Sequence, residues 1–379
     1  MPPRRANRDA CFCVTALVRT RAALTLAWDE EGIPRAASYL TPAPRCVAVI
    51  RAFSFGALET RGRGAPCSLM SGTVDPGAFR LERAEVRDGV TLGYVRAGMG
   101  GYPLLLVHGW PETKRIWWRN IGPLADAGFE VIVPDLRGFG DSGLASDGFY
   151  DLAAHARDMH ALVSNVLGHE RCSAAGGDLG GGAIQDLGLR FDGFIERQVL
   201  FNCILPLLPE AYEAAGIAAA PPRELRMAAD YFVRQGREAD DLAAELDTPE
   251  RRRRYVGEFY GHRFWATPGA FSREDVEFMS EPFADAERLR AGWGNYESAL
   301  GTRPLSEAPR FFEVSAVPTL ALYGPDDHVI WRQFPQMCEV AFSELIGPFV
   351  VPRAGHFLQW ERAQLFNQAI EYFLRDLQG

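Results

Sequence analysis

From about residue 79 onward, short hydrophobic runs alternate with longer amphipathic stretches. Each short run ends at a Gly or Pro break, and most are followed by a helical pattern. This alternation is typical of buried parallel strands joined by crossover helices. The predicted strands are 80–86, 90–96, 104–107, 131–133, 172–177, 198–201, 318–323 and 348–352, and the predicted helices are 114–127, 150–167, 179–190 and 363–377. The first two strands flank Arg87-Asp88-Gly89, which predicts a hairpin turn.

The short hydrophobic runs that predict strands are absent between residues 207 and 309. This region is rich in helix formers, Arg and aromatic residues, and it predicts helices at 224–234, 239–246, 249–260, 273–279 and 285–300. Because strand patterns resume afterwards, we interpret 207–309 as a helical unit inserted into an α/β core made of 70–206 and 310–379. The run Arg251 to Arg254 is predicted to form a solvated helix face.

Residues 1–69 differ in kind from the rest of the chain. They carry ten Arg, no Lys and five acidic residues, a charge of +5, against −14 for the remainder. An apolar run follows Arg4-Arg5, but Arg19 and Arg21 interrupt it, which argues against a signal peptide. We therefore expect a disordered or upstream-translated leader, with Met70 as a candidate true start.

The composition narrows the function classes. The 379 residues are 47% hydrophobic and carry a net charge of −9, which suits a globular protein with a large core. Because the net charge is negative, the protein has no overall positive potential that would attract nucleic acid or anionic lipid. The chain contains no run of eighteen uncharged apolar residues, so no membrane span is predicted. The seven cysteines include no CxxC pair, so neither a zinc site nor a disulfide framework is indicated. We expect a cytoplasmic protein that acts on small molecules.

Asp178 stands at the end of a predicted buried strand, within Ala175-Gly176-Gly177-Asp178-Leu179-Gly180-Gly181-Gly182. A sharp strand-to-helix turn strains the backbone of its central residue and needs small residues two positions before and after it. The helix that follows would point the Leu179 amide at charge developing near Asp178. A glycine-rich phosphate loop is the alternative, but the chain has no GxGxxG in register here and no GxxxxGK[ST].

A nucleophile needs a base, and the base needs an orienting partner. His356 lies between the last predicted strand and the last helix, and Asp327 lies in the loop after the preceding strand. All three residues would therefore lie at the carboxyl ends of parallel strands, where open sheets place their sites. The chain order nucleophile, acid, histidine is that of α/β-hydrolases.

Residues from about 79 to 377 resemble the α/β-hydrolase superfamily, and within it the branch with an Asp nucleophile, the epoxide hydrolases and hydrolytic dehalogenases. Three further motifs carry this resemblance: His108-Gly109-Trp110-Pro111, Asp135-Leu136-Arg137-Gly138-Phe139-Gly140-Asp141-Ser142 and Gly355-His356. It implies a mostly parallel sheet flanked by helices, a helical cap (lid) at 207–309, and an oxyanion hole made by the backbone amides of Trp110 and Leu179.

The choice within the branch depends on the leaving group. Haloalkane dehalogenases typically have Trp after the nucleophile and often Asn in the HGxP slot, and fluoroacetate-type enzymes use nearby arginines. This chain has Leu179, Trp110 and Gly182 instead, so both dehalogenase interpretations lose support. Many epoxide hydrolases also have Trp after the nucleophile, and Leu179 departs from that pattern.

Epoxide hydrolases use two cap tyrosines, because a phenol can donate a proton to the ring oxygen as the C–O bond breaks. Tyr296 in Asn295-Tyr296 resembles the second of these tyrosines, and Tyr231 resembles the first. Three other cap tyrosines, Tyr212, Tyr255 and Tyr260, compete for the first role.

The resemblance thus implies an epoxide hydrolase that turns a hydrophobic epoxide and water into a vicinal diol through an Asp178 ester. No metal or organic cofactor is needed. A hydrolytic dehalogenase and a non-catalytic receptor on the same fold are the alternatives, and a homodimer is left open.

Overall fold

The computed structural model describes residues 27–28, 34–35, 75–218, 230–261 and 265–378. Strands β1 (Ala27–Trp28) and β2 (Pro34–Arg35) form an antiparallel pair within a separate unit, Val18–Gly72. The predicted leader otherwise lies outside the described residues. The fold and site below are those of residues 75–378.

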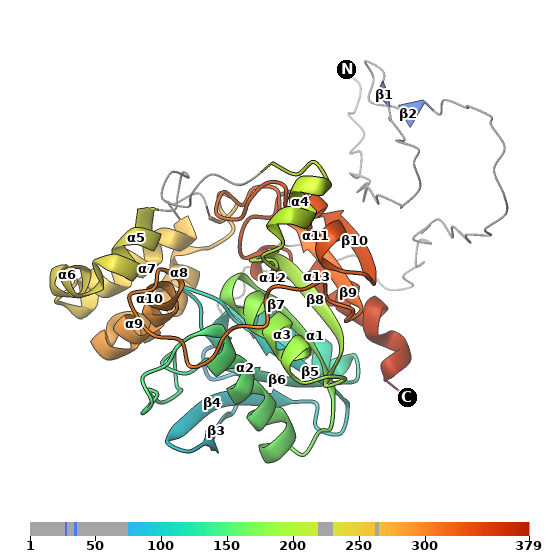
Figure 1. Ribbon diagram of the computed structural model, residues 1–379. Coiled ribbons are helices and arrows are strands. Elements are labelled where there is room, and N and C mark those ends of the chain that lie inside the picture. Colours follow the sequence, from blue (N-terminus) through green and yellow to red (C-terminus); the bar gives the residue numbers. More distant parts are fainter. Residues whose placement is uncertain (1–26, 29–33, 36–74, 219–229, 262–264, 379) are drawn as a thin grey trace, which may run out of the picture. The chain divides into compact units, whose positions relative to one another are not determined.

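A single eight-stranded sheet forms the centre of this part (Figure 1). Its spatial order is β10-β9-β8-β7-β5-β6-β4-β3. All neighbours pair in parallel except β4, which is antiparallel to both β3 and β6. The strands are β3 (Leu81–Arg87), β4 (Val90–Ala97), β5 (Tyr102–Val107), β6 (Phe129–Pro134), β7 (Cys172–Gly177), β8 (Ile195–Cys203), β9 (Thr319–Tyr323) and β10 (Leu345–Val350). The loops after β5, β7, β8, β9 and β10 therefore all leave the sheet at the C-terminal ends of the strands, which we call its carboxyl edge.

Two helix pairs flank the sheet, α2 against α3 and α1 against α13 (Figure 1). The helices of the core are α1 (Trp118–Asp126), α2 (Leu152–His160), α3 (Asp178–Arg190), α11 (Phe334–Ala341), α12 (Leu358–Glu361) and α13 (Ala363–Leu374), with short 3-10 turns η1 (Lys114–Trp117) and η5 (Arg375–Leu377) and a π-helical turn η2 (Ala161–Val166). The central strands are buried on both faces because these helices cover them, which explains their continuous hydrophobic runs.

The predicted α/β fold is confirmed, with small differences in the elements. The last strand begins at Leu345, three residues before the predicted start, and it carries Pro348 within it. Proline is tolerated here because β10 is an edge strand with an irregular register.

Helices fill the insertion between β8 and β9. They are α4 (Pro209–Ala214), α5 (Asp230–Arg237), α6 (Ala239–Glu245), α7 (Pro249–Gly261), α8 (Arg273–Ser280), η4 (Glu281–Ala284), α9 (Ala286–Gly292) and α10 (Gly294–Ala299). We call α5 to α10 the inserted helices. The predicted single helix 285–300 is wrong, because it breaks at Trp293 between two glycines. The predicted helix 224–234 lies largely outside the described residues.

The prediction that Arg251 to Arg254 form a solvated face is wrong for Arg252. Its side chain is buried and donates to the carbonyl oxygens of Leu246 and Ala284 at 2.9 and 2.7 Å. Arg252 thus joins two turns of the insertion, whereas Arg251, Arg253 and Arg254 are exposed. An amphipathic pattern cannot detect a buried guanidinium that satisfies backbone carbonyls.

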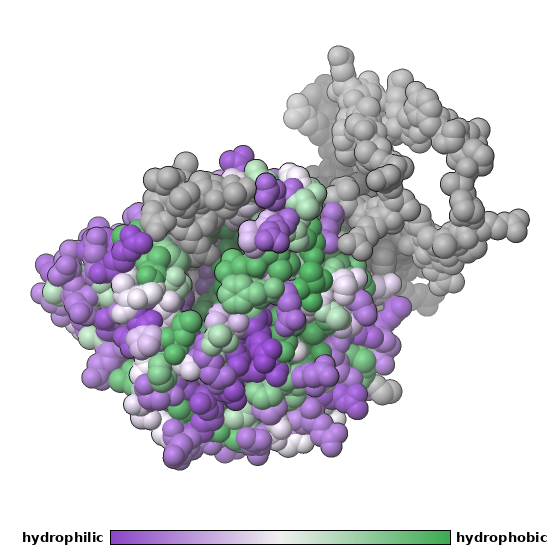
Figure 2. All heavy atoms as spheres, viewed as in Figure 1, coloured by the Kyte–Doolittle hydropathy of each residue, from purple (hydrophilic) through white to green (hydrophobic). Residues whose placement is uncertain are grey.

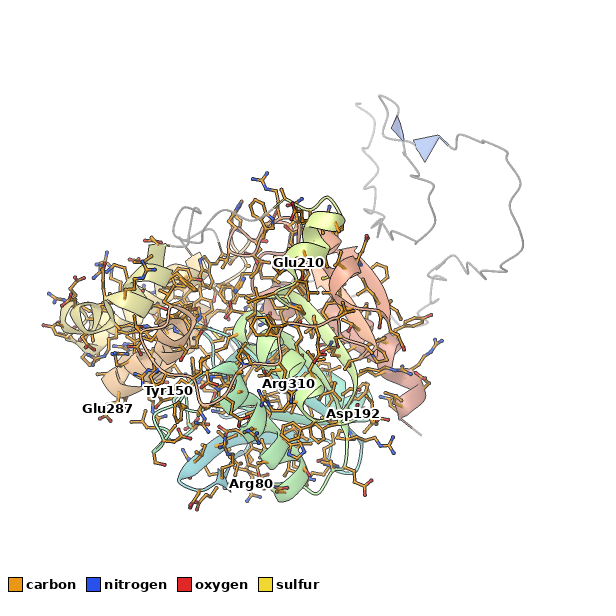
Figure 3. The ribbon with its side chains drawn as sticks, viewed as in Figure 1. Arg80, Tyr150, Asp192, Glu210, Glu287 and Arg310 are labelled. Carbon is orange, nitrogen blue, oxygen red and sulfur yellow. The ribbon has the colours of Figure 1, made fainter. Side chains whose placement is uncertain are left out.

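Tyr150 lies where the inserted helices meet the core, on the loop before α2 (Figure 3). A Cβ atom at Gly294 would lie 2.8 Å from the Tyr150 Cβ, and one at Gly138 would lie 2.6 Å from its ring. Both glycines are therefore required by close packing between α10, Tyr150 and the loop after β6.

The surface shown in Figure 2 mixes hydrophilic and hydrophobic residues, and hydrophilic side chains predominate over the inserted helices. No helix in the described part of the chain combines the length and the apolar character that a membrane span requires.

Candidate active site

Asp178 occupies a strained turn between β7 and α3. Its φ is +45°, in the left-handed region that residues with a Cβ rarely adopt. The turn closes tightly because glycines surround it: a Cβ at Gly180 would lie 2.3 Å from the Val107 carbonyl oxygen, and one at Gly176 would lie 2.8 Å from the Gly180 carbonyl carbon. The local sequence therefore forces the Asp178 side chain out at the carboxyl edge of the sheet.

The structure brings Asp178, His356 and Asp327 together. His356 Nε2 lies 3.4 Å from Asp178 Oδ2, and His356 Nδ1 lies 2.9 Å from Asp327 Oδ2. Asp327 Oδ1 in turn accepts from the amides of Val329 and Ile330 at 2.6 and 3.2 Å. The imidazole is thus held between two carboxylates, one of which is fixed by its own backbone loop.

In this group of residues, interactions with nearby charges and amides shift the pKa values more than burial does. Burial lowers the pKa of His356, but the carboxylates of Asp327 and Asp178 raise it well above its usual value. Burial raises the pKa of Asp178, but His356 and the amides of Trp110 and Leu179 bring it below its usual value. Asp178 is therefore ionised at neutral pH, as a nucleophile must be.

The loop after β5 supplies an amide to the Asp178 carboxylate. The Trp110 N–H donates to Asp178 Oδ1 at 2.8 Å. The fully buried Glu112 holds this loop, because its Oε2 accepts from the Gly109 amide at 2.5 Å and its Oε1 accepts from Gln359 Nε2 at 2.9 Å. Burial raises the pKa of the Glu112 carboxyl group to about 7.

The histidine loop is fastened on both sides of His356. Glu361 accepts from the amides of Gly355 and Phe357 at 2.8 and 3.0 Å. The His356 amide donates to the Trp265 carbonyl oxygen at 2.6 Å, and the Trp265 ring lies edge-on to the imidazole with 4.7 Å between ring centroids. The insertion therefore contacts the histidine directly.

Tyr231 and Tyr296 meet over the Trp110 ring. Tyr231 stacks on Trp110 at 5.5 Å, Tyr296 lies perpendicular to it at 5.6 Å, and the two tyrosine rings are 5.5 Å apart. Both are buried. Because the backbone of the same Trp110 donates to Asp178, α5 and α10 place both tyrosines next to the loop that contacts the carboxylate.

The three competing tyrosines have hydroxyl groups engaged elsewhere. Tyr212 donates to the Pro206 carbonyl oxygen at 2.7 Å, and Tyr260 donates to the Pro111 carbonyl oxygen at 2.5 Å. The Tyr255 hydroxyl accepts from Gln235 at 2.9 Å. Tyr231 lies beside Tyr296 through the 5.5 Å contact between their rings.

Sequence reasoning did not identify Glu112 or Asn202, and it left Trp265 among many aromatic residues of the insertion. A signal existed for Asn202, since a polar residue at the carboxyl end of a buried strand lies at the edge where sites form. Glu112 directly follows the His108-Gly109-Trp110-Pro111 motif, but nothing local indicates that its carboxylate turns back to the Gly109 amide.

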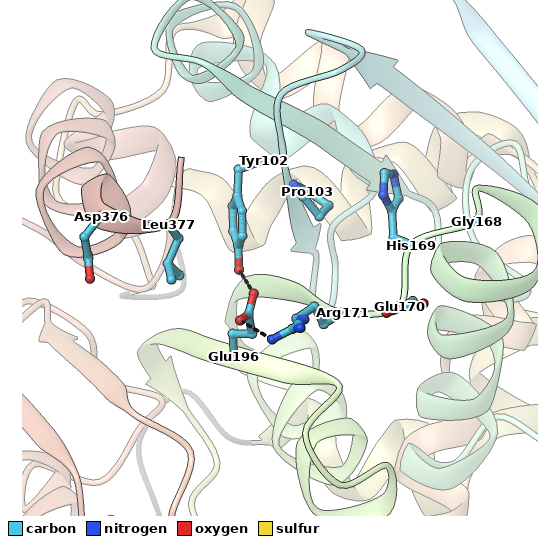
Figure 4. Close-up of a pocket in the computed structure, with 9 residues that line it drawn as sticks. All are labelled: Tyr102, Pro103, Gly168, His169, Glu170, Arg171, Glu196, Asp376 and Leu377. Atoms are coloured by element: carbon cyan, nitrogen blue, oxygen red, sulfur yellow. Dashed lines mark hydrogen bonds and ion pairs between the residues drawn. The ribbon is translucent and has the colours of Figure 1, made fainter. Parts of the chain in front are cut away.

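Within the described residues, no group of three or more His, Cys, Asp or Glu side chains could hold a metal ion. A surface pocket of about 520 Å³ lies at the opposite edge of the sheet, beside the start of β5 (Figure 4). Within this pocket, Glu196 accepts from Tyr102 at 2.7 Å and from Arg171 at 3.1 Å. Neither Asp178 nor His356 is among the residues that line this pocket, so it is separate from them.

Known proteins resemble this chain in sequence and in fold. A family profile described as "alpha/beta hydrolase fold" matches residues 102–363. The chain is 30% identical over 297 residues to the soluble epoxide hydrolase of Corynebacterium sp. (strain C12), covering 76% of this chain and 94% of the relative. It is 26% identical to epoxide hydrolase 3 of Xenopus tropicalis, covering 91% and 88%. The solved structure of the epoxide hydrolase CorEH without ligand matches with a TM-score of 0.68 and 25% identity, covering 79% of this chain and 99% of that one.

Proposed function

This chain belongs to the α/β-hydrolase fold family, and on that premise we propose that it is an epoxide hydrolase that forms a covalent ester on Asp178. One observation carries the proposal. An ionised carboxylate at a strained turn touches a histidine whose other ring nitrogen is bound to Asp327, and two buried tyrosines pack on the adjacent Trp110. Relatives named as epoxide hydrolases support the same conclusion.

In the first step, Asp178 attacks one carbon of the epoxide. The new C–O bond forms as the ring C–O bond breaks, and the electron pair of the broken bond goes to the ring oxygen. Tyr296 and Tyr231 hydrogen-bond to that oxygen, and one of them donates its proton and is left as a tyrosinate. The product of this step is a hydroxyalkyl ester of Asp178.

In the second step, His356 removes a proton from water, and the resulting hydroxide attacks the Asp178 carbonyl carbon. Asp327 orients the imidazole and stabilises its protonated form. The Trp110 and Leu179 amides stabilise the oxyanion, and each donor of this kind contributes about 3–4 kcal/mol in comparable sites. The intermediate then expels the diol oxygen, which takes the proton from His356. The carboxylic acid left on Asp178 returns its proton to the tyrosinate formed in the first step, which restores both the Asp178 carboxylate and the phenol.

The substrate class follows from the surroundings of the site. The rings around Trp110 are Tyr231, Phe259, Trp265 and Tyr296. Aromatic walls favour a hydrophobic epoxide over a charged one. In this proposal, the segment 207–309 is a cap that encloses the substrate. The three described cysteines are free and buried, which suits the cytoplasm.

The test is a substrate panel together with an ester-trapping variant. Purified enzyme is incubated with styrene oxide and other hydrophobic epoxides, and separately with short haloalkanes and haloacetates, with diol and halide as readouts. His356→Gln should accumulate an Asp178-linked ester that mass spectrometry detects after proteolysis. Asp178→Asn, the matched control, should form no adduct. Halide release without diol formation, or no adduct in folded His356→Gln, would refute the proposal.

A further inference from the structure

Asn202 has an unusual position at the end of β8. It is fully buried, and its φ is +38°, in the left-handed region that Asn tolerates better than most residues. Its neighbour Cys203 forms a bridge with Asp178. The strained residue thus directly precedes the residue that pairs with the proposed nucleophile.

The Asn202 side chain joins the two loops that carry the acid and the base. Its Nδ2 donates to the Gly355 carbonyl oxygen at 2.7 Å, and its Oδ1 accepts from the Gly324 amide at 2.9 Å. Gly355 directly precedes His356, and Gly324 lies three residues before Asp327. Only a side chain that donates and accepts at once can make both bonds, which an amide does.

These two loops pack backbone against backbone. A Cβ at Gly324 would lie 2.5 Å from the Gly355 carbonyl oxygen, so no side chain separates them. One further bond joins them, from the Asp326 amide to the Ala354 carbonyl oxygen at 3.0 Å. A shift of either loop would therefore change the 2.9 Å contact between His356 and Asp327 directly.

We infer that Asn202 is a positioning residue that sets the relative place of Asp327 and His356 by bridging Gly324 and Gly355. This inference rests on the proposed function and assigns Asn202 to the second step. His356 acts as a base only when the Asp178 ester is hydrolysed. Loss of the bridge should therefore slow ester hydrolysis and leave ester formation almost unchanged.

Two variants separate the bridge from the backbone strain. Asn202→Gly accepts the positive φ without cost and removes both hydrogen bonds. Asn202→Asp keeps an acceptor for the Gly324 amide but places a carboxylate oxygen against the Gly355 carbonyl oxygen. Gln198→Glu is the matched control, because this buried amide on the same strand bonds Thr319 Oγ1 at 2.9 Å, away from both loops.

The experiment measures the two steps separately with styrene oxide by stopped-flow tryptophan fluorescence and by rapid quench with mass spectrometry. In both Asn202 variants we expect hydrolysis to slow about tenfold or more, because each variant loses hydrogen bonding that holds the Asp327 and His356 loops together. Ester formation should stay within about twofold of wild type, and the ester should accumulate at steady state. Gln198→Glu should keep the wild-type ratio of the two rates.

A second readout does not depend on the substrate. The proton between His356 Nδ1 and Asp327 should give a downfield NMR signal that disappears in His356→Gln. It should shift in both Asn202 variants and stay in place in Gln198→Glu. If wild type forms no ester but the signal shifts, the proposed function fails and the positioning role stands. An unchanged signal in the Asn202 variants, or equal loss in both steps, would overturn the inference.

Discussion

His356 Nε2 lies 3.4 Å from Asp178 Oδ2, while Nδ1 of the same ring lies 2.9 Å from Asp327 Oδ2. The two contacts have different consequences in the proposed reaction. Esterification removes the charge of Asp178 and with it one of the interactions that raise the pKa of His356. The imidazole therefore becomes easier to deprotonate once the ester has formed, and Asp327 remains as its charged partner.

Asp327→Asn should change the pH dependence of ester hydrolysis. His356 acts as a base only when neutral, so the hydrolysis rate rises as pH increases through its pKa. Because Asp327 raises this pKa, the variant should move the midpoint of the rise to lower pH. The plateau rate should fall about 10²-fold or more, since the imidazole loses its orienting carboxylate.

Single-turnover hydrolysis rates between pH 5 and 9 test this prediction. Asp326→Asn is the control. Asp326 directly precedes Asp327 in the same loop, but its carboxylate accepts from Thr267 Oγ1 instead of from His356. A midpoint that stays in place or moves to higher pH in Asp327→Asn would contradict the role given to Asp327.

Tyr296→Phe and Tyr231→Phe should each slow ester formation about 10²-fold, because each removes a proton donor to the ring oxygen. The double variant should form almost no ester. Both changes keep the ring that packs on Trp110, so each variant should still fold. Tyr255→Phe is the matched control, and its rate of ester formation should equal that of wild type. Equal rates in Tyr231→Phe and wild type would exclude Tyr231 from the reaction.

Gly180→Ala should destabilise the protein by about 2 kcal/mol or more, because the new Cβ would lie 2.3 Å from the Val107 carbonyl oxygen and 2.6 Å from that of His108. Either α3 or the end of β5 would have to shift. Gly261→Ala in α7 is the control, since a Cβ there meets no atom within 4 Å. It should stabilise the helix by up to about 1 kcal/mol. Denaturant unfolding measures both changes, and similar values for the two would contradict the close packing of the turn.

Glu112→Gln should reduce the pH dependence of stability between about pH 4.5 and 7. Burial raises the pKa of Glu112 from 4.5 to about 7, so the folded state binds a proton over this range that the unfolded state has lost. The free energy of unfolding therefore falls as pH rises through this window, by about 3 kcal/mol in total. Gln cannot ionise and lacks this contribution.

Unfolding of wild type and Glu112→Gln at pH 5 and pH 8 tests this expectation. Glu287→Gln, a change at an exposed side chain, should keep the wild-type difference between the two pH values. A difference equally large in Glu112→Gln would mean that another group causes the pH dependence.

The hydrophobic pattern was sufficient to predict the α/β fold, since alternating buried runs and amphipathic helices leave few other arrangements. Asp178 could be predicted because the constraint on its turn is local. The turn holds Asp178 in a strained backbone conformation, and it closes only because glycines on both sides leave room for the neighbouring backbone. His356 and Asp327 followed because parallel strands bring their carboxyl ends to one edge.

Only the tertiary structure decided which groups touch at that edge. Tyr231 contacts Tyr296 because α5 and α10 pack together, and no local pattern specifies that packing. The side chains of Asn202 and Arg252 bond partners that are distant in sequence. The Glu112 side chain turns back to bond the Gly109 amide, three residues before it. The partners in these bonds are backbone amides and carbonyls, which almost every residue type carries, so the residue types alone do not reveal the bonds.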